Sequence, residues 1–405
     1  MKPIVRAGRM KPVHSDIRGP LFVEAMKRQK QGIDVLKLNT GNPATFGFGL
    51  PDSIKNALME HMQDGVGYCD FKGMPQARQA ICDYETSKGI KGITSDDVFI
   101  GNGVSEVVSF ALTPLLNDGD EVLVPSPSYS LWGNSVYLED GKPVFYTCDE
   151  KANWYPDIQD IRSKITDKTK AIVIINPNNP TGVLYPKELL LEIIQIARES
   201  GLLIFADEIY DRLVMDGKQH ISLASLTEDV PVITLNGLSK SHCLCGYRCG
   251  WMVISGPREL TEDYRQGIIQ LTSLRLCANT MAQIVIPAAL DDMETPASMI
   301  RPGGRIYEQR EATVRELEKI NGLSFVKNDA AFYVFPKLDV KKFNITNDKQ
   351  FAHDLLDATN ILLVPGSGFD WKDPDHFRIV MLPQADVLSD AIRRMGTFLD
   401  GYKQK

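Results

Sequence analysis

Short apolar runs alternate with longer amphipathic segments between about residues 46 and 284. In these runs the hydrophobic residues follow one another without interruption, as in AIVII at Ala171–Ile175. A strand that is apolar at every position is typical of a parallel sheet covered by helices on both faces. The runs predicted as strands are Val98–Gly101, Glu121–Pro125, Val144–Thr147, Ala171–Ile175, Leu202–Ala206, Val232–Leu235 and Trp251–Ser255.

The segments between these runs have the spacing of helices. In Pro186–Ser200 (PKELLLEIIQIARES) apolar residues recur at i, i+3, i+4 and i+7, which predicts a helix with one buried face. Strand and helix alternating many times predict an α/β fold, a doubly wound and mostly parallel seven-stranded sheet. We also expect one long helix after Leu271, because neither Gly nor Pro interrupts the chain before Pro287.

The last hundred or so residues have a mixed pattern that predicts a second, smaller α+β domain. Its predicted elements are a helix near Gly304–Ile320, a strand at Ala331–Phe335, a helix at Asp348–Thr359, strands at Ile361–Val364 and Phe377–Val380, and a closing helix from about Gln384. The first 45 residues offer no strand to the main sheet. We therefore expect a large domain of residues 46–284 and a small domain formed by residues 1–45 and 285–405.

Composition narrows the class of protein. The 405 residues allow two or three domains, and 45 Lys and Arg against 52 Asp and Glu give a net charge of −7. This acidic balance argues against binding to nucleic acid or an anionic membrane. No apolar run approaches the roughly 20 residues of a membrane-spanning helix, and no apolar signal segment follows the basic N-terminus. With seven cysteines, an odd count, reduced thiols and a cytoplasmic enzyme are expected.

Polar and reactive side chains follow four of the predicted strands. The carboxyl ends of parallel strands meet at one edge of a sheet, where ligands bind in α/β proteins. Four ends that carry such residues predict a binding site at that edge. The segments are Asn102–Ser105, Asn176–Gly182, Asp207–Tyr210 and Asn236–Lys240.

The first of these segments suits a phosphate group. Gly103 allows close approach of the backbone, and the N–H groups of a following helix would point at an anion. A plain strand-to-helix turn capped by Ser105 is the alternative. A dinucleotide-binding motif fits poorly, because Glu106 stands at the third glycine position and Glu121 opens a strand instead of ending one.

Asp207 and Lys240 indicate which phosphate compound fits. A carboxylate at the end of a buried strand needs a partner, which a salt bridge, a helix cap or a cationic ring nitrogen would supply. Lys240 is either a surface residue or a nucleophilic amine. An amine, a buried carboxylate and a phosphate cradle together indicate pyridoxal phosphate, which offers an aldehyde, a ring nitrogen and a phosphate.

The chain resembles the fold type I, pyridoxal-phosphate-dependent aminotransferases of class I and II over essentially its whole length. Within them it is most similar to the alanine (glutamate–pyruvate) aminotransferase group. Arg248 follows Lys240 by eight positions, as in the family. The strings that carry the resemblance are NPNNPTG at 176–182, DEIY at 207–210, GLSK ending at Lys240, DIRGP at 16–20 and LNTGNP at 38–43.

The resemblance implies a role for each matching residue. Lys240 would bind the cofactor's aldehyde and shuttle the reacting proton, and Asp207 would keep the ring nitrogen protonated. Tyr210 and Asn179 would hydrogen-bond the ring oxygen O3′, and Tyr129 would stack on the ring. The implied phosphate-binding residues are Gly103, Val104, Ser105, Ser239, Arg248 and, from the neighbouring subunit of a homodimer, Tyr68. The implied substrate-binding residues are Gly41, Asn179 and Arg378 for the α-carboxylate, with Arg18 for a second carboxylate.

Most of these residues also have plainer interpretations. Arg378 would equally pair with Asp375 or Asp373, and Asn179 would shape a Pro-Asn-Asn-Pro turn. Tyr129 and Tyr68 would be ordinary, partly buried aromatic residues, and Arg18 would only anchor the N-terminal segment. His242, in the loop after Lys240, is an extra metal ligand, a pocket residue or a residue without a role.

The sequence departs from the family at three places. Gly237 stands where many relatives have Ser, and Asn328-Asp329-Ala330-Ala331 stands in place of Pro-x-Gly-Ala. Ser15 replaces a tyrosine that is common in the alanine group. Because the N-terminal segment is expected to close over the substrate, Ser15 bears on substrate choice more than on reaction type.

The resemblance implies transfer of an amino group between an L-amino acid and a 2-oxo acid, with L-alanine and 2-oxoglutarate giving pyruvate and L-glutamate as the first choice. A β-eliminating C–S lyase and a broader valine or aromatic aminotransferase share nearly all the residues. A transcription regulator with an aminotransferase-like domain would carry an added basic winged helix, for which only about 45 residues precede the α/β domain. Cys243, Cys245 and Cys249 lack a fourth ligand, so no metal site is predicted.

Overall fold

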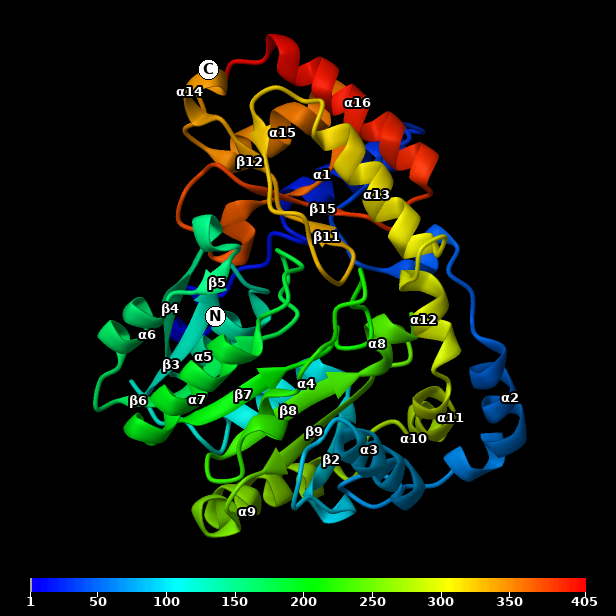
Figure 1. Cartoon of the computed structure of the whole chain (residues 1–405), viewed down its shortest axis with the longest axis vertical. Helices are drawn as coiled ribbons and strands as arrows, with labels where there is room; N and C mark the ends of the chain where they lie inside the picture. The colour runs from blue at the N-terminus through cyan, green and yellow to red at the C-terminus, as the bar shows by residue number, and fades with distance from the viewer. Residues whose placement is uncertain (1) are drawn as a thin grey trace.

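The computed structural model describes residues 2–405, arranged in two parts that lie one above the other in Figure 1. The lower part is built around one large sheet. The upper part contains the helices after about residue 304, drawn in yellow to red. Helix α1 (Pro20–Lys30), drawn in blue, also lies in the upper part, so the start of the chain packs with its end.

Within residues 2–405 the large sheet contains the seven predicted strands and one more. In spatial order these are β2 (Val98–Asn102), β9 (Cys249–Ser255), β8 (Val232–Gly237), β7 (Leu203–Asp207), β6 (Thr169–Ile175), β3 (Glu121–Ser126), β4 (Lys142–Asp149) and β5 (Tyr155–Pro156). Neighbouring strands from β8 to β4 pair in parallel, and β9 is antiparallel to both its neighbours. The additional strand, β5, pairs antiparallel with β4 at the edge of the sheet. A strand of two residues has no periodicity by which the sequence would predict it.

Helices cover both faces of this sheet, as the continuous apolar runs predict (Figure 1). Ile172 of β6 belongs to a hydrophobic cluster with Leu190 of α7 (Lys187–Ser200). The next residue, Val173, belongs to a second cluster that includes side chains of α4 (Val104–Leu112). Successive side chains of a strand point to opposite faces of the sheet. Because helices cover both faces, the strand needs an apolar residue at every position.

The upper part has its own core. Its main helices, α13 (Arg305–Leu317), α15 (Asp348–Thr359) and α16 (Ala385–Gly401), surround a three-stranded sheet of β11 (Tyr333–Val334), β15 (Phe377–Val380) and β14 (Val364–Pro365) within residues 2–405. The predicted bounds of α15 and β15 are confirmed. The strand predicted at Ala331–Phe335 is shorter, and the one predicted at Ile361–Val364 is divided into β13 (Ile361–Leu362) and β14.

The N-terminal segment joins this upper core. Strand β1 (Leu36–Lys37) pairs in parallel with β13. Leu38, which follows β1, is fully buried in one cluster with Leu355 and Ile392. Residues that are more than 300 positions apart in the sequence thus form one hydrophobic core.

The prediction of one long helix after Leu271 is wrong. Helix α9 (Arg258–Arg275) ends at Leu276, whose φ is +77°, and the chain continues as α10 (Thr280–Ile284) and α11 (Ile286–Asp291). The new start is capped by Asn279, whose side-chain oxygen accepts a hydrogen bond from the N–H of Ala282 (3.4 Å). Asn is a favoured N-cap residue, and this signal was available in a segment that lacks Gly and Pro.

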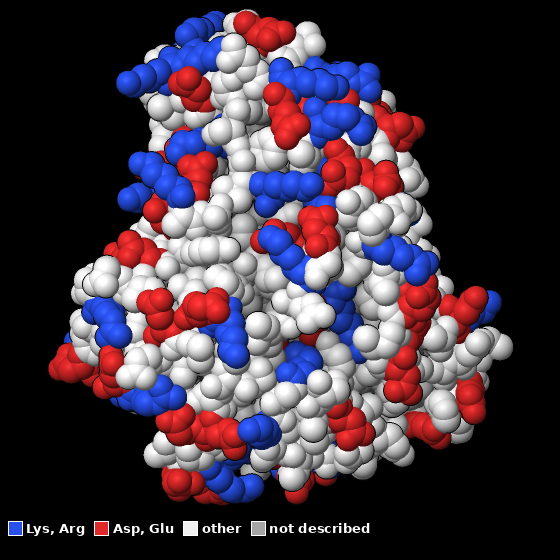
Figure 2. Space-filling view, in the orientation of Figure 1, with Lys and Arg blue, Asp and Glu red and all other residues white. Residues whose placement is uncertain are grey.

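Across residues 2–405 no single helix is both long and apolar enough to cross a membrane. Helix α9 passes such a test only when combined with the α10–α11 segment, from which it is bent by 118°. On the face shown in Figure 2, Lys and Arg are interspersed with Asp and Glu. The net charge of −7 is therefore not gathered in one acidic area of this face.

Candidate active site

A cavity of about 870 Å³ lies at the carboxyl ends of the strands, where the upper part meets the sheet. All but two of the predicted site residues line it, and the exceptions are Gly103 and Tyr68. The predicted residues at the cavity are Arg18, Gly41, Val104, Ser105, Tyr129, Asn179, Asp207, Tyr210, Ser239, Lys240, Arg248 and Arg378. Of the charged side chains that line it within residues 2–405, four are cationic and only Asp207 is anionic.

One end of the cavity has the features of an anion site. Helix α4 begins at Val104, so its first N–H groups have no acceptor within the helix. Gly103 has φ +82°, and a Cβ at this position would collide with the guanidinium of Arg248. Arg248 donates to Ser105 Oγ (3.0 Å) and to the carbonyl of Cys245 (2.8 Å). The absence of a side chain at Gly103 therefore brings a helix N-terminus and a guanidinium together.

Asp207 lies in the floor of the cavity and is 5% exposed. Its carboxylate accepts hydrogen bonds from Trp132 Nε1 (3.0 Å) and from the N–H of Ile209 (3.4 Å). Within residues 2–405 it has no cationic partner at ion-pair distance, so the salt-bridge interpretation is wrong. Burial raises the pKa of Asp207 to about 6. A cationic ligand atom at this point would favour the ionised form.

Lys240 belongs to the short helix α8 (Leu238–Ser241), which follows β8 directly. Its Nζ donates a hydrogen bond to the carbonyl of Gly41 (3.1 Å) and lies 5.8 Å from the centre of the Phe332 ring. The amine thus lies between the sheet and the upper part and is not a solvated surface group. This position leaves it accessible from the cavity.

Arg378 is 1% exposed and, within residues 2–405, has no carboxylate at ion-pair distance. It donates to Asn179 Oδ1 (2.9 Å) and to the carbonyl of Asn39, and its Nε has no partner. The pairing with Asp375 is wrong, because Asp375 accepts from Trp371 Nε1 (2.9 Å) and contacts His376. Burial lowers the pKa of Arg378. A buried guanidinium that lacks a counter-ion and faces a cavity is suited to a carboxylate ligand.

Two residues of the site were missed by the sequence analysis, Trp132 and Tyr333. The hydroxyl of Tyr210 donates to that of Tyr333 (3.0 Å), whose ring lies 4.5 Å from the guanidinium carbon of Arg378. Burial raises the pKa of Tyr210, so its hydroxyl stays protonated. Trp132 lies three residues after Tyr129, and Tyr333 lies in the predicted strand Ala331–Phe335. In both places an aromatic residue has the pattern of a core residue.

The remaining predicted residues lie at the edge of the cavity or outside it. Tyr129 lines the cavity and is 37% exposed. Ser15 and Arg18 line it from the N-terminal segment, and Arg18 is exposed. Tyr68 is 84% exposed and does not reach the cavity of its own chain.

The departures from the family pattern have structural counterparts. A Cβ at Gly237 would lie 2.5 Å from the carbonyl oxygen of Cys249, so this backbone contact leaves no room for the common Ser. The Asn328–Ala331 segment forms a turn in which the Asn328 side chain donates to the carbonyl of Ala330 (2.8 Å). Ala331 has φ +58° in this turn.

The three clustered cysteines point in different directions. Cys243 Sγ contacts Met299 Sδ (3.8 Å), Cys245 Sγ contacts Asn42 Oδ1 (3.1 Å), and Cys249 Sγ donates to the carbonyl of Ala282 (2.9 Å). His242 is buried outside the cavity, with Nε2 3.2 Å from the carbonyl of Asp292, and burial lowers its pKa to about 4. The absence of a metal site stays a prediction.

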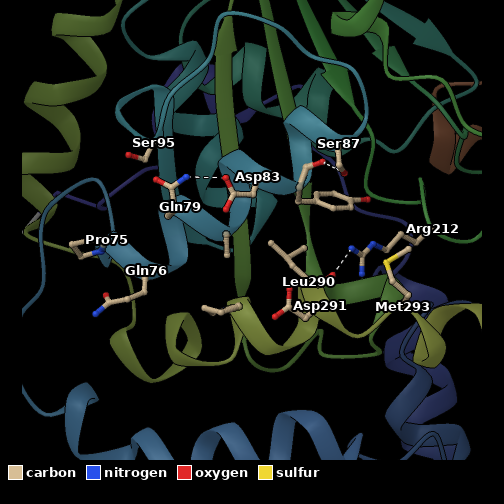
Figure 3. Close-up of a pocket in the computed structure, with 13 residues that line it drawn as sticks. Pro75, Gln76, Gln79, Asp83, Ser87, Ser95, Arg212, Leu290, Asp291 and Met293 are labelled. Carbon is tan, nitrogen blue, oxygen red and sulfur yellow. Dashed lines mark hydrogen bonds between the residues drawn. The ribbon is translucent and has the colours of Figure 1, made fainter.

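A second hollow of about 860 Å³ lies between α3 (Pro75–Ser87) and α11 (Figure 3). Arg212 lies at its edge, 4.3 Å from the centre of the Tyr84 ring, and donates to the carbonyls of Ala289 (3.2 Å) and Leu290 (2.9 Å). None of the residues predicted to act on a ligand lines this hollow. The first cavity is therefore the candidate active site.

Comparison with known proteins identifies the family of the chain. The family model described as aminotransferase class I and II matches residues 33–394. The chain belongs to the class I and II aminotransferases. This aminotransferase is 50% identical over 404 residues to the glutamate-pyruvate aminotransferase AlaA of Haemophilus influenzae, with 100% of both chains covered.

Solved structures give the same result. An aminotransferase from Escherichia coli superposes with a TM-score of 0.98 at 48% identity, covering 100% of both chains. The alanine aminotransferase from Pyrococcus furiosus gives a TM-score of 0.93 at 40% identity, covering 98% of this chain and 100% of that one. The fold type I architecture predicted for this aminotransferase is thereby confirmed.

Enzymes of this family depend on pyridoxal phosphate, and the donor set of this aminotransferase fits that cofactor. The cradle at Gly103 and Arg248 suits the phosphate. The buried carboxylate of Asp207, which lacks a cationic partner within residues 2–405, suits a protonated ring nitrogen. The amine of Lys240 suits the aldehyde.

Proposed function

We propose that this protein is an alanine aminotransferase that converts L-alanine and 2-oxoglutarate to pyruvate and L-glutamate. The observation that carries the proposal is the buried Arg378 at the wall of the cavity, which has no carboxylate partner within residues 2–405. Every amino acid and 2-oxo acid has a carboxylate that would fill this position. The choice of alanine rests on the full-length similarity to a glutamate-pyruvate aminotransferase.

The residues proposed to hold pyridoxal phosphate are those that line the floor and one end of the cavity. Lys240 would hold the aldehyde, Asp207 the ring nitrogen, and Tyr210 with Asn179 the ring oxygen, while Tyr129 would lie on the ring. The proposed phosphate group of residues is Gly103, Val104, Ser105, Ser239 and Arg248, with Tyr68 from a second subunit. The chemistry supplied by the bound cofactor is withdrawal of electrons from the α-carbon of the substrate.

The protein's own residues would bind the substrate and move its proton. Arg378 presents a planar fork that binds a carboxylate by two parallel hydrogen bonds, next to the amide of Asn179 and the backbone of Gly41. The Nζ of Lys240 would take the proton from the α-carbon and return it on the way to the product. Asp207 would hold positive charge at the ring nitrogen throughout, because burial leaves no water to compete with it.

Arg18 supports 2-oxoglutarate as the amino acceptor. It lines the cavity from the N-terminal segment, and within residues 2–405 its guanidinium has no carboxylate partner. A substrate with two carboxylates would use Arg378 for one and Arg18 for the other. Pyruvate and alanine have only the first, so Arg18 would act in one half of the reaction.

A panel of amino donors tests this function. With 2-oxoglutarate as acceptor, alanine is expected to react at least tenfold faster than valine or tyrosine in kcat/KM, because each misplaced side chain costs about 1–3 kcal/mol of transition-state binding. A higher kcat/KM for valine or an aromatic donor would mean that this donor, and not alanine, is the preferred substrate. Pyruvate formed from cystathionine without any 2-oxo acid would instead make the protein a C–S lyase.

We further propose that the active unit is a homodimer. Several large apolar side chains beside Tyr68 are exposed: Met59, Met62, Val66, Leu274 and Leu276. The two segments that carry them lie side by side, since Thr280 Oγ1 donates to the carbonyl of Gly65 (2.6 Å) and Arg275 donates to that of Phe71 (3.2 Å). A second copy covering this area would bury it and carry Tyr68 to the neighbouring cavity.

The variant Tyr68→Phe tests the shared site. It is expected to weaken pyridoxal phosphate binding about tenfold, which is the loss of one hydrogen bond to a charged group. Mixing Tyr68→Phe with Lys240→Ala subunits is expected to restore one site with normal cofactor affinity per mixed dimer. A monomer in sedimentation, or no recovery on mixing, would contradict a site built from two subunits.

Two further proposals concern the division of the chain into domains and the location of the protein in the cell. We propose that residues 46–284 form the cofactor-binding domain and that residues 1–45 and 285–405 form the domain that closes over it, with Met1 outside the described residues. Helix α11, at the start of the last range, packs on α3 of the cofactor-binding domain. The pairing of β1 with β13 supports this grouping of the chain ends. We propose a cytoplasmic enzyme, which the free thiols of all seven cysteines support.

A further inference from the structure

The N-terminal arm, defined as residues 11–18, forms part of the cavity wall. Ser15, Ile17 and Arg18 line the cavity, although the arm has no regular secondary structure. It passes between α5 (Leu131–Leu138) of the lower part and the C-terminal elements of the upper part. A segment without internal hydrogen bonds of a helix or sheet depends on contacts with other elements to keep its position.

Asn134 of α5 contacts the arm with its whole amide group. The side-chain Oδ1 accepts a hydrogen bond from the N–H of His14 (3.1 Å), and Nδ2 donates to the carbonyl of the same residue (2.5 Å). A primary amide thus pairs with both polar groups of one peptide residue, in the manner of a neighbouring β-strand. Within residues 2–405, these are the only hydrogen bonds between the arm and α5. Asn134 itself also lines the cavity.

The other polar contacts of the arm are with residues outside α5. His14 Nε2 lies 3.4 Å from Asp370 Oδ1, and Asp16 lies 3.2 Å from Lys349 Nζ. The carbonyl of Ile17 accepts from Asn39 Nδ2 (2.7 Å). The arm therefore bridges the cavity, and the amide of Asn134 is its hydrogen-bonded attachment to α5.

We propose that Asn134 is a positioning residue that holds the N-terminal arm against α5, so that Ser15 and Arg18 form one wall of the substrate site. The proposal rests on the proposed function, because the substrate it concerns is the dicarboxylate bound in the same cavity. Loss of the amide would release the arm on one side and move Arg18 away from the substrate. Binding of 2-oxoglutarate would weaken, while the groups that act on its α-carbon stay in place.

The variant Asn134→Ala tests the proposal in two ways on the full-length holoenzyme. Trypsin cleavage of the Arg18–Gly19 bond, followed by mass spectrometry without substrate, is expected to be about tenfold faster, because cleavage follows the population of the open arm. The KM for 2-oxoglutarate is expected to rise about five- to tenfold, with kcat within about twofold of the wild type. Asn134→Asp keeps the acceptor for the N–H of His14 and loses the donor to its carbonyl. The cleavage rate and the KM for 2-oxoglutarate should therefore each rise roughly threefold.

Arg9→Ala is the matched control. Arg9 precedes the arm and pairs with Asp140 on the surface (3.0 Å), with both side chains about half exposed. It is expected to change neither KM nor cleavage at Arg18, because exposed ion pairs contribute little. A wild-type cleavage rate in Asn134→Ala would contradict the proposal that Asn134 holds the arm against α5. Faster cleavage with an unchanged KM for 2-oxoglutarate would contradict the proposal that the arm forms a wall of the substrate site. Failure of the proposed function is separate, since it would show as a wild type that transfers no amino group.

Discussion

The cofactor-free Asp207→Asn variant is expected to be more stable at pH 8 than the cofactor-free wild type by about 3 kcal/mol, although its activity falls. Burial raises the pKa of Asp207 from 3.8 to about 6, and each unit corresponds to about 1.36 kcal/mol. The folded protein therefore binds this proton more tightly than the unfolded chain does. This stability is fully present below about pH 3.8 and is lost as the pH rises from there through 6, because the buried carboxylate has no cationic partner to favour its ionisation. Asn is neutral at every pH and still accepts the hydrogen bond from Trp132.

The measurement is urea unfolding of both cofactor-free proteins at pH 8 and pH 5. The difference in free energy of unfolding between Asp207→Asn and the wild type should fall to roughly half at pH 5, where the wild-type carboxyl is mostly protonated in the folded protein. Asp373→Asn, at an exposed position, is the control and should change stability at neither pH. Transamination by Asp207→Asn should fall about 10²–10³-fold, the usual loss when an electrostatic partner of the reacting centre is removed. Full activity, or no gain at pH 8, would contradict the role assigned to this carboxylate.

Lys240→Ala is expected to lose transamination by at least about 10⁴-fold, because no other amine is proposed to move the substrate's proton. The purified variant should also lack the visible absorption band that a lysine-bound cofactor gives. Lys240→Arg separates charge from chemistry. Its guanidinium can still donate to the carbonyl of Gly41, but it does not deprotonate in proteins and so should be equally inactive.

Lys187→Ala is the control for a lysine outside the cavity. Lys187 is exposed at the start of α7, and its loss should leave both the rate and the absorption band unchanged. If Lys240→Ala kept the band and the activity, the assignment of Lys240 and the proposed reaction would both be wrong. Addition of a small primary amine to Lys240→Ala should recover part of the rate, since the variant leaves a space where the amine was.

The strands were predictable because a strand that is buried on both faces has a continuous run of apolar residues in the sequence. Each strand of the parallel sheet needs apolar residues at every position, and Ile172 and Val173 face different clusters for that reason. Breaks that depend on a single residue were not predictable in the same way. Leu276 ends α9 in a conformation that favours glycine, and nothing in its residue type indicates this.

The site could be predicted where short strings place polar residues after strands, as at Asp207 and Lys240. It could not be predicted where the role depends on contacts between distant segments. Trp132 is 75 positions from Asp207, and Tyr333 is 123 positions from Tyr210, yet each pair shares a hydrogen bond. An indole or phenol in an apolar string has the pattern of a core residue, and only the fold shows what its polar atom faces.

The pairing of β1 with β13 has a consequence for biosynthesis. During translation the strands of the large sheet leave the ribosome while more than a hundred residues of the chain are still unmade, and domains generally fold in that order. Arg378 and the partner strand of β1 emerge only near the end. The nascent protein therefore carries the sheet, with Asp207 and Lys240 in place, before it has a closed cavity. Retention of cofactor and substrate is expected only after the last hundred residues are released.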